Sequence, residues 1–96
     1  MAKQQQTVTV ERDGISVEVD LAFMRTWQGV ALAADMQSKR LDDGQRLAAT
    51  VAYYRAVCPN IDEVDEAMAE ASGAPVEAGD LMQLVAECVR EATPKN

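Results

Sequence analysis

The spacing of apolar residues along the chain changes at about residue 20. Before that point apolar and polar residues alternate in two short runs, the period of half-buried β-strands. The runs flank Asp13 and Gly14, a pair that favours a two-residue type I′ turn, so the sequence predicts a β-hairpin over residues 7–20. One face of this hairpin would carry its aliphatic side chains: Val8, Val10, Ile15, Val17 and Val19.

After residue 20 apolar residues recur every three or four positions, which is typical of amphipathic helices. Asp42 with Gln45, and Asn60 with Glu63, match the capping-box pattern of helix starts, and Pro59 ends the preceding helix. The predicted helices cover about 21–40, 43–57, 61–72 and 79–92. Residues 1–6 are expected to be a disordered lead and residues 93–96 a tail.

Each predicted helix has an apolar stripe that is expected to face a common core. The stripes are Phe23, Trp27, Val30, Ala31 and Ala34; Leu47, Val51, Tyr54 and Cys58; Ile61, Val64, Met68 and Ala71; and Leu81, Leu84, Val85, Cys88 and Ala92. Tyr53 lies about 100° from Tyr54 around its helix and is expected to be partly exposed. The fold class that follows is mainly α with a small β element, an N-terminal hairpin followed by a four-helix cluster in one domain over 7–92.

The composition of the chain disfavours several classes of function, among them enzymes and nucleic-acid-binding proteins. The chain has 96 residues, no histidine and a net charge of −7, so it lacks the commonest general base and the commonest zinc ligand. The negative charge also disfavours nucleic acids and anionic membranes as partners. We therefore expect a non-enzymatic protein with no catalytic residue, cofactor, metal site or small-molecule substrate. The absence of a long apolar run favours a cytoplasmic location.

The two cysteines, Cys58 and Cys88, do not have the spacing of a redox or metal motif. We expect them to be reduced and buried as small apolar side chains, with a disulfide formed on oxidation as the alternative.

Acidic residues gather in the last third of the chain. Nine of them lie between residues 62 and 91 against Arg90 alone, a net charge of −8. This charge has two interpretations, a solvated outer face or a surface that attracts a basic partner. Asp62, Glu66 and Glu70 follow one another at helical spacing on one face. Trp27 and Tyr53 either are exposed, as aromatic residues of an interface are, or belong to a second core face. The candidate partner-binding residues are therefore the three carboxylates together with the aromatic residues Phe23, Trp27 and Tyr53.

The order of these segments resembles the tail assembly chaperones of long-tailed (siphovirus-type) phages and prophages. The resemblance is carried by the hairpin TVTVERDGISVEVD, the helical segments LAFMRTW and QRLAATVAYYRAV, the acidic helix NIDEVDEAMAEA and the final helix DLMQLVAECVREA. It implies a non-enzymatic chaperone of the bacterial host cytoplasm. Such proteins bind the tape-measure protein, a long helical chain prone to aggregation, and help to recruit the tail-tube protein.

Two other functions stay open. The acidic face is compatible with a small acidic phage inhibitor that mimics nucleic acid, such as an anti-defence protein. The apolar helix faces are compatible with a homodimeric adaptor, and homo-oligomers are left open for the chaperone as well.

Overall fold

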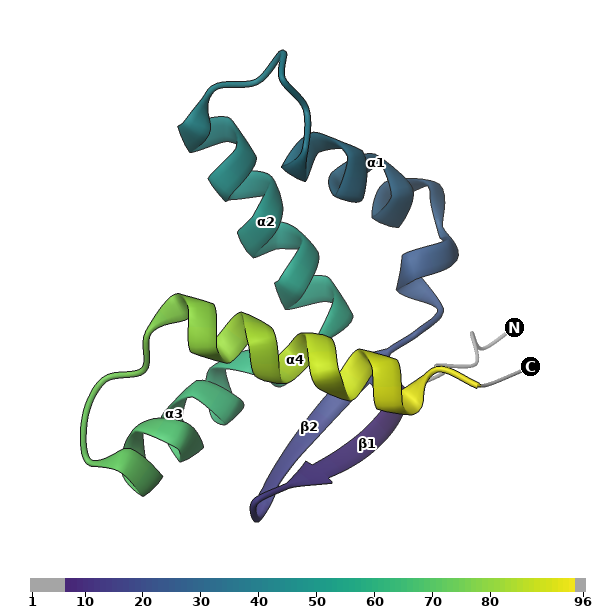
Figure 1. Cartoon of the computed structure of the whole chain (residues 1–96). Helices are drawn as coiled ribbons and strands as arrows, with labels where there is room; N and C mark the ends of the chain where they lie inside the picture. The colour runs from purple at the N-terminus through teal and green to yellow at the C-terminus, as the bar shows by residue number, and fades with distance from the viewer. Residues whose placement is uncertain (1–6, 95–96) are drawn as a thin grey trace.

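A computed structural model describes residues 7–94 of the chain. The fold is mainly α-helical with an N-terminal β-hairpin, as the sequence predicts (Figure 1). The elements are β1 (Thr7–Arg12), β2 (Ile15–Asp20), the 3-10 helix η1 (Phe23–Arg25), α1 (Trp27–Met36), α2 (Asp43–Val57), α3 (Ile61–Ser72) and α4 (Ala78–Ala92). The lead expected at residues 1–6 and the last two residues of the expected tail, 95–96, lie outside the described residues.

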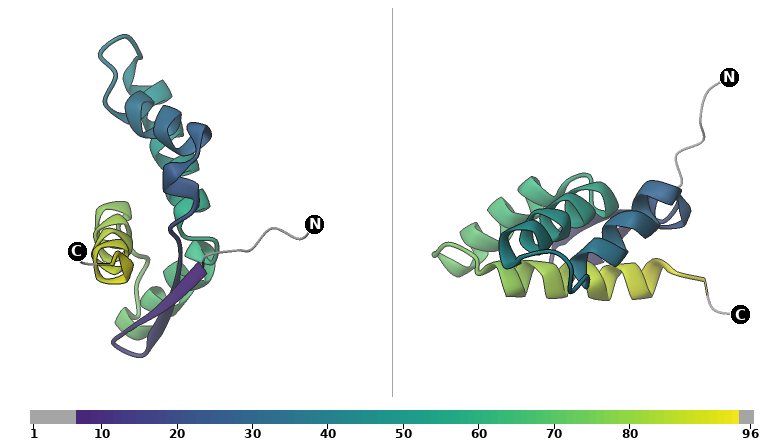
Figure 2. Two further views of the ribbon diagram at one scale, coloured as in Figure 1. Left: turned by 90° about the vertical axis from the view of Figure 1, so that its right-hand side faces the viewer. Right: turned by 90° about the horizontal axis from the view of Figure 1, so that it is seen from above.

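Helices α1 and α2 pack against each other as an antiparallel pair, whereas α3 and α4 cross at a steep angle (Figure 1). The pair α1–α2 extends away from the β-hairpin, whereas α3 and α4 both contact it (Figure 1). In the side view of Figure 2, α4 lies to one side of the β-hairpin and α1–α2 extends beyond it. The result is an angled arrangement in which no element of residues 7–94 covers one face of α1–α2.

The β-hairpin has the predicted register and turn. Val10 pairs with Val17 in the antiparallel ladder. Asp13 and Gly14 both have positive φ, 52° and 79°, which is the backbone of a type I′ turn. Val10, Val17 and Val19 are buried, so the aliphatic face of the hairpin forms one wall of the core.

The other wall of the core comes from the end of α2, the start of α3 and the middle of α4. Its buried members are Val57, Cys58, Ile61, Val64, Val85 and Cys88. The stripe predicted for α4 is confirmed, since Leu81, Leu84 and Ala92 pack against these residues. On α3 the predicted stripe holds as far as Met68, but Ala71 is exposed. Both cysteines are free, buried thiols, as expected.

The single helix predicted over 21–40 is wrong, because the chain breaks at Thr26. Thr26 has an extended backbone (φ −77°, ψ 160°) and its hydroxyl accepts a 3.0 Å hydrogen bond from the Gly29 N–H, which makes it the N-cap of α1. The same hydroxyl donates to the Phe23 carbonyl at 2.7 Å. The apolar period continues through this point, but a local threonine cap ends η1 and begins α1 in a new direction. The Asp20 carboxylate accepts from the Phe23 N–H at 3.2 Å at the start of η1.

Two of the predicted apolar stripes are only partly buried. On α1, Trp27, Val30 and Ala34 are exposed, although the sequence pattern placed them in the core. On α2, Leu47 and Val51 are exposed, whereas Cys58, at the other end of the same stripe, is fully buried. The physical reason is that the core lies at one end of α2, and no element of residues 7–94 covers the rest of this face.

The capping box predicted at Asn60 is also wrong. The Asn60 side chain makes no capping hydrogen bond to α3. It reaches β2 instead, where its Oδ1 accepts from the Glu18 N–H at 2.9 Å and its Nδ2 donates to the Ser16 carbonyl at 3.0 Å. A side-chain amide therefore pairs with the free edge of β2 as a neighbouring strand would. The other predicted box, Asp42 with Gln45, is confirmed.

We expect Asn60→Ala to lower the free energy of unfolding by about 1–3 kcal/mol, because two backbone groups of β2 lose their partner. Urea denaturation measures this cost. Glu63→Ala is the matched control, because Glu63 is the exposed partner that a capping box at Asn60 would require. Its expected effect is within about 0.5 kcal/mol, and an equal loss in both variants would contradict the role of Asn60 as a strand clamp.

We expect Gly29→Ala to destabilise the protein although alanine is the better helix former. An added Cβ at Gly29 would lie 2.2 Å from the Phe23 carbonyl oxygen, a contact that backbone movement must relieve. The expected cost is about 1–3 kcal/mol. Gly79→Ala on α4 meets nothing within 4 Å and is expected to stabilise by up to about 1 kcal/mol. Thermal unfolding of both variants tests this, and shifts in the same direction would contradict it.

Candidate protein-binding surface

The most unusual feature of the surface is a group of large apolar side chains on α1 and α2. Trp27 is 84% exposed, Leu47 63%, Val30 53% and Val51 46%. Scattered exposed apolar residues are common in proteins, but contiguous ones mark interaction sites. The four side chains therefore indicate an interaction surface only if they lie next to one another.

Helix geometry places them on one face. Two of the exposed residues each follow a less exposed one by a single position: Val30 follows buried Gly29, and Leu47 follows half-buried Arg46. One position is a rotation of about 100°. Because α1 and α2 run antiparallel (Figure 1), the same rotation in each helix leads to the same face of the pair. Trp27 and Val51 extend this face by one turn on their own helices. We call Trp27, Val30, Leu47 and Val51 the apolar face.

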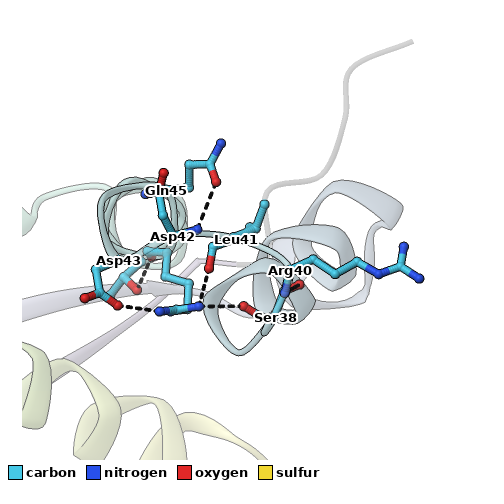
Figure 3. A network of polar contacts seen from close by, with 8 residues as sticks. Ser38, Arg40, Leu41, Asp42, Asp43 and Gln45 are labelled. Atoms are coloured by element: carbon cyan, nitrogen blue, oxygen red, sulfur yellow. Dashed lines mark hydrogen bonds and ion pairs between the residues drawn. The ribbon is translucent and has the colours of Figure 1, made fainter.

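The loop between α1 and α2 holds the two helices in register. The Arg46 guanidinium donates to the Ser38 carbonyl at 2.9 Å and to the Leu41 carbonyl, and it pairs with the Asp43 carboxylate (Figure 3). Beside it, the Gln45 N–H donates to the Asp42 carboxylate at 2.8 Å. These contacts fix both ends of the loop, so the apolar face is formed before any partner binds.

The apolar face continues into a pocket at the lower end of α2. Val51 and Tyr54 line this pocket together with residues of α3 and α4, among them Ile61 and Leu81. Its volume is about 250 Å³. Val51 belongs to both features, which makes the face and the pocket one continuous surface.

The three aromatic candidates from the sequence have different environments. Trp27 is exposed, as an interface residue would be. Phe23 and Tyr53 are half-buried and pack edge to face, with ring centroids 6.2 Å apart. Tyr53 also contacts Tyr54, with centroids 5.9 Å apart. Burial raises the pKa of Tyr53 above its ordinary value. Phe23 and Tyr53 thus connect η1 and α2 to the core, and the structure does not bring them together with Trp27.

The three acidic candidates, Asp62, Glu66 and Glu70, are all exposed along α3. Two other acids of this region have a structural partner that the sequence reasoning missed. Arg12 of β1 donates to Glu91 at 2.9 Å and to Glu87 at 3.1 Å, both on α4. The pKa of Arg12 is raised, first by the hydrogen bond to Glu91.

A sequence signal for the Arg12 contact did exist. Arg12 pairs with Ile15 and so lies on the aliphatic side of the hairpin, where a cation needs an anionic neighbour. The consequence is that Glu87 and Glu91 fasten α4 to the β-hairpin, whereas Asp62, Glu66 and Glu70 of α3 are exposed to solvent.

Two further observations on residues 7–94 concern metal ligands and the two thiols. Among residues 7–94, no three His, Cys, Asp or Glu side chains lie close enough together to hold a metal ion. Burial raises the pKa of Cys58 to about 11 and that of Cys88 above its ordinary value, so both thiols hold their protons. No helix within the same range is both long enough and apolar enough to cross a bilayer.

Comparison with family models, with curated proteins and with solved structures finds no match for this chain.

We expect thiol reagents to modify Cys58 and Cys88 at least about tenfold more slowly in the native protein than in denaturant, at mildly alkaline pH.

Folded Cys58 keeps its proton to a higher pH than unfolded Cys58. The free energy of unfolding should therefore fall as the pH rises from about 8.5 towards the folded value of about 11. Labelling rates and urea denaturation across this range check both statements, and rapid native labelling would contradict the burial of the thiols.

Proposed function

We propose that this chain is a non-enzymatic protein-binding module that holds a helical segment of a partner against its apolar face. In line with the resemblance described above, the module is a tail assembly chaperone, and its partners are the tape-measure protein and the tail-tube protein of a phage or prophage. The single observation that carries the proposal is the exposure of Trp27, Val30, Leu47 and Val51 on one face of α1–α2.

The free energy that burial of the apolar face would release supports a protein partner. Fully burying a large aliphatic side chain is worth about 1.5–3 kcal/mol, so the four residues together supply a substantial part of a binding free energy. Tryptophan is among the residues that most often dominate interfaces. A helical partner fits a pair of antiparallel helices, because an amphipathic helix can place its apolar stripe along the groove between them.

The shape of the molecule supports the same conclusion. All of α2 except its last turn, and the whole of α1, extend beyond the β-hairpin, so a long chain has access to this pair (Figure 2). Arg46 and the capping box hold the pair in place, so little order has to be gained on binding. A chaperone for an aggregation-prone helical chain needs such a preformed apolar surface.

The test is co-expression of this chain with the tape-measure protein encoded in the same phage or prophage genome, followed by size-exclusion chromatography. We expect a soluble complex with the native chain. Leu47→Lys should lower the yield of complex at least about tenfold, because it places a charge in the apolar face. Trp27→Ala should weaken the complex as well.

The matched control is Ala48→Lys, which adds the same charge to an exposed residue one position further around α2. It should leave the complex intact. An aggregated tape-measure protein beside the free native chain would contradict the proposal, as would equal losses in Leu47→Lys and Ala48→Lys. A native chain that elutes alone as a dimer would instead favour the homodimeric adaptor.

The exposed row of Asp62, Glu66 and Glu70 favours the acidic inhibitor as the second candidate function. Its signature is salt-sensitive binding to a nuclease or another DNA-binding protein. Neutralising the row with Asp62→Asn, Glu66→Gln and Glu70→Gln should abolish such binding, whereas Leu47→Lys should not affect it.

A further inference from the structure

The residues that line the pocket beside the apolar face, together with its volume, indicate what kind of group fits into it. Most of its lining is apolar, including Val51, Tyr54, Leu81 and Met82. Its volume of about 250 Å³ is below the roughly 300–1,000 Å³ of typical small-molecule sites. A pocket of this size and lining fits one large apolar side chain better than a metabolite, which is how anchor residues bind at protein interfaces.

The charges at the pocket are divided between its two sides. Asp62 and Asp65 line it from α3, and Arg55 lines it from α2. Asp62 and Asp65 are three positions apart, so they lie on the same face of α3. Glu66, next to Asp65, is exposed and adds to the negative potential on this side. A segment that enters the pocket therefore meets anionic side chains on its α3 side.

We infer that the pocket receives a large apolar side chain from a cationic amphipathic helix of the partner, and that a lysine or arginine one turn from this anchor pairs with Asp62 and Asp65. The inference rests on the proposed function, since the same partner helix would lie along the apolar face and reach the pocket past Val51. Residues one turn apart are neighbours on a helix surface, which allows one helix to supply both the anchor and the cation.

A second copy of this chain fits the pocket less well. Its most amphipathic helices, α3 and α4, already bury their apolar stripes in the chain's own core, and both carry more acidic than basic residues. Docking either one would place carboxylates against Asp62 and Asp65. Like charges brought together at an interface oppose association, so charge complementarity favours a foreign, basic helix.

The test uses designed amphipathic peptides of about 18 residues, long enough to be helical when bound. One peptide has a leucine stripe flanked by lysines, the second has the same stripe flanked by glutamates, and the third has the lysines but serines in place of leucines. Fluorescence anisotropy measures the binding of each peptide to the full chain. We expect the Leu–Lys peptide to bind at least about tenfold more tightly than either of the others.

Variants then locate the contact. The double variant Asp62→Asn and Asp65→Asn keeps the shape of both side chains and should weaken the Leu–Lys peptide about tenfold, with a smaller dependence on salt. The matched control, Glu70→Gln, removes one charge from α3 about one turn beyond Glu66 and should change binding less than about twofold. Amide chemical shifts of Leu81 and Met82 should move on binding.

A charge-reversal variant distinguishes the loss of the contact from a loss of folding. Asp65→Lys should reverse the preference, so that the Leu–Glu peptide binds more tightly than the Leu–Lys peptide. Equal binding of the two leucine peptides to the native chain would overturn the inference. So would the absence of binding by any peptide, or an equal loss in Glu70→Gln and in the double variant.

The failure of this inference can be told apart from the failure of the proposed function. If Leu47→Lys disrupts the tape-measure complex while the double Asn variant leaves it intact, the apolar face binds the partner and the pocket inference is overturned. If Leu47→Lys has no effect, the proposed function itself fails.

Discussion

The hydrogen bonds between the Asn60 side chain and the edge of β2 anchor the junction of α2 and α3 to the β-hairpin, and the other helices are arranged around this junction. Asn60 accepts from the Glu18 N–H and donates to the Ser16 carbonyl, so one side chain satisfies two backbone groups of the strand. It lies between the end of α2 and the start of α3, and its Oδ1 also accepts from the Cys58 thiol. The junction of the two helices is thereby fastened to the β-hairpin, and the pocket between α2, α3 and α4 forms above it.

The small size of the core explains why an apolar face is left over. Its buried members are valines, cysteines and an isoleucine, gathered where the β-hairpin meets α3, α4 and the last turn of α2. The rest of α2 and all of α1 lie beyond this centre (Figure 1). They are held by the loop contacts of Arg46 and by η1, whose Phe23 carbonyl approaches Gly29. These contacts are polar or backbone contacts, so they position the helix pair without burying its apolar face.

The sequence predicts the parts of this structure that local rules decide. The type I′ turn, the register of the β-hairpin, the bounds of α2 and α3 and the stripe of α4 all follow from spacing and capping residues. It fails where a polar side chain has two competing partners: Thr26 caps a new helix inside an apolar period, and Asn60 binds a strand instead of its own helix. Periodicity also shows which residues share a face but not whether anything covers it. For this reason the sequence places Leu47 and Val51 in the core, although both are exposed in the candidate site. Of the four residues of the apolar face, Trp27 is the one that the sequence also offers as an interface residue.

The distribution of charge separates two contributions to binding. Arg12 engages Glu87 and Glu91, so these two acids stabilise the fold and are not free to attract a partner. The acids that face solvent are concentrated on α3, next to the pocket, whereas the apolar face itself consists of uncharged side chains. Apolar burial supplies affinity with little dependence on direction, while charges set the rate and orientation of docking. A helix bound along α1–α2 would therefore gain its affinity from the apolar face and its orientation from α3, because only one direction places its basic residues beside Asp62 and Asp65.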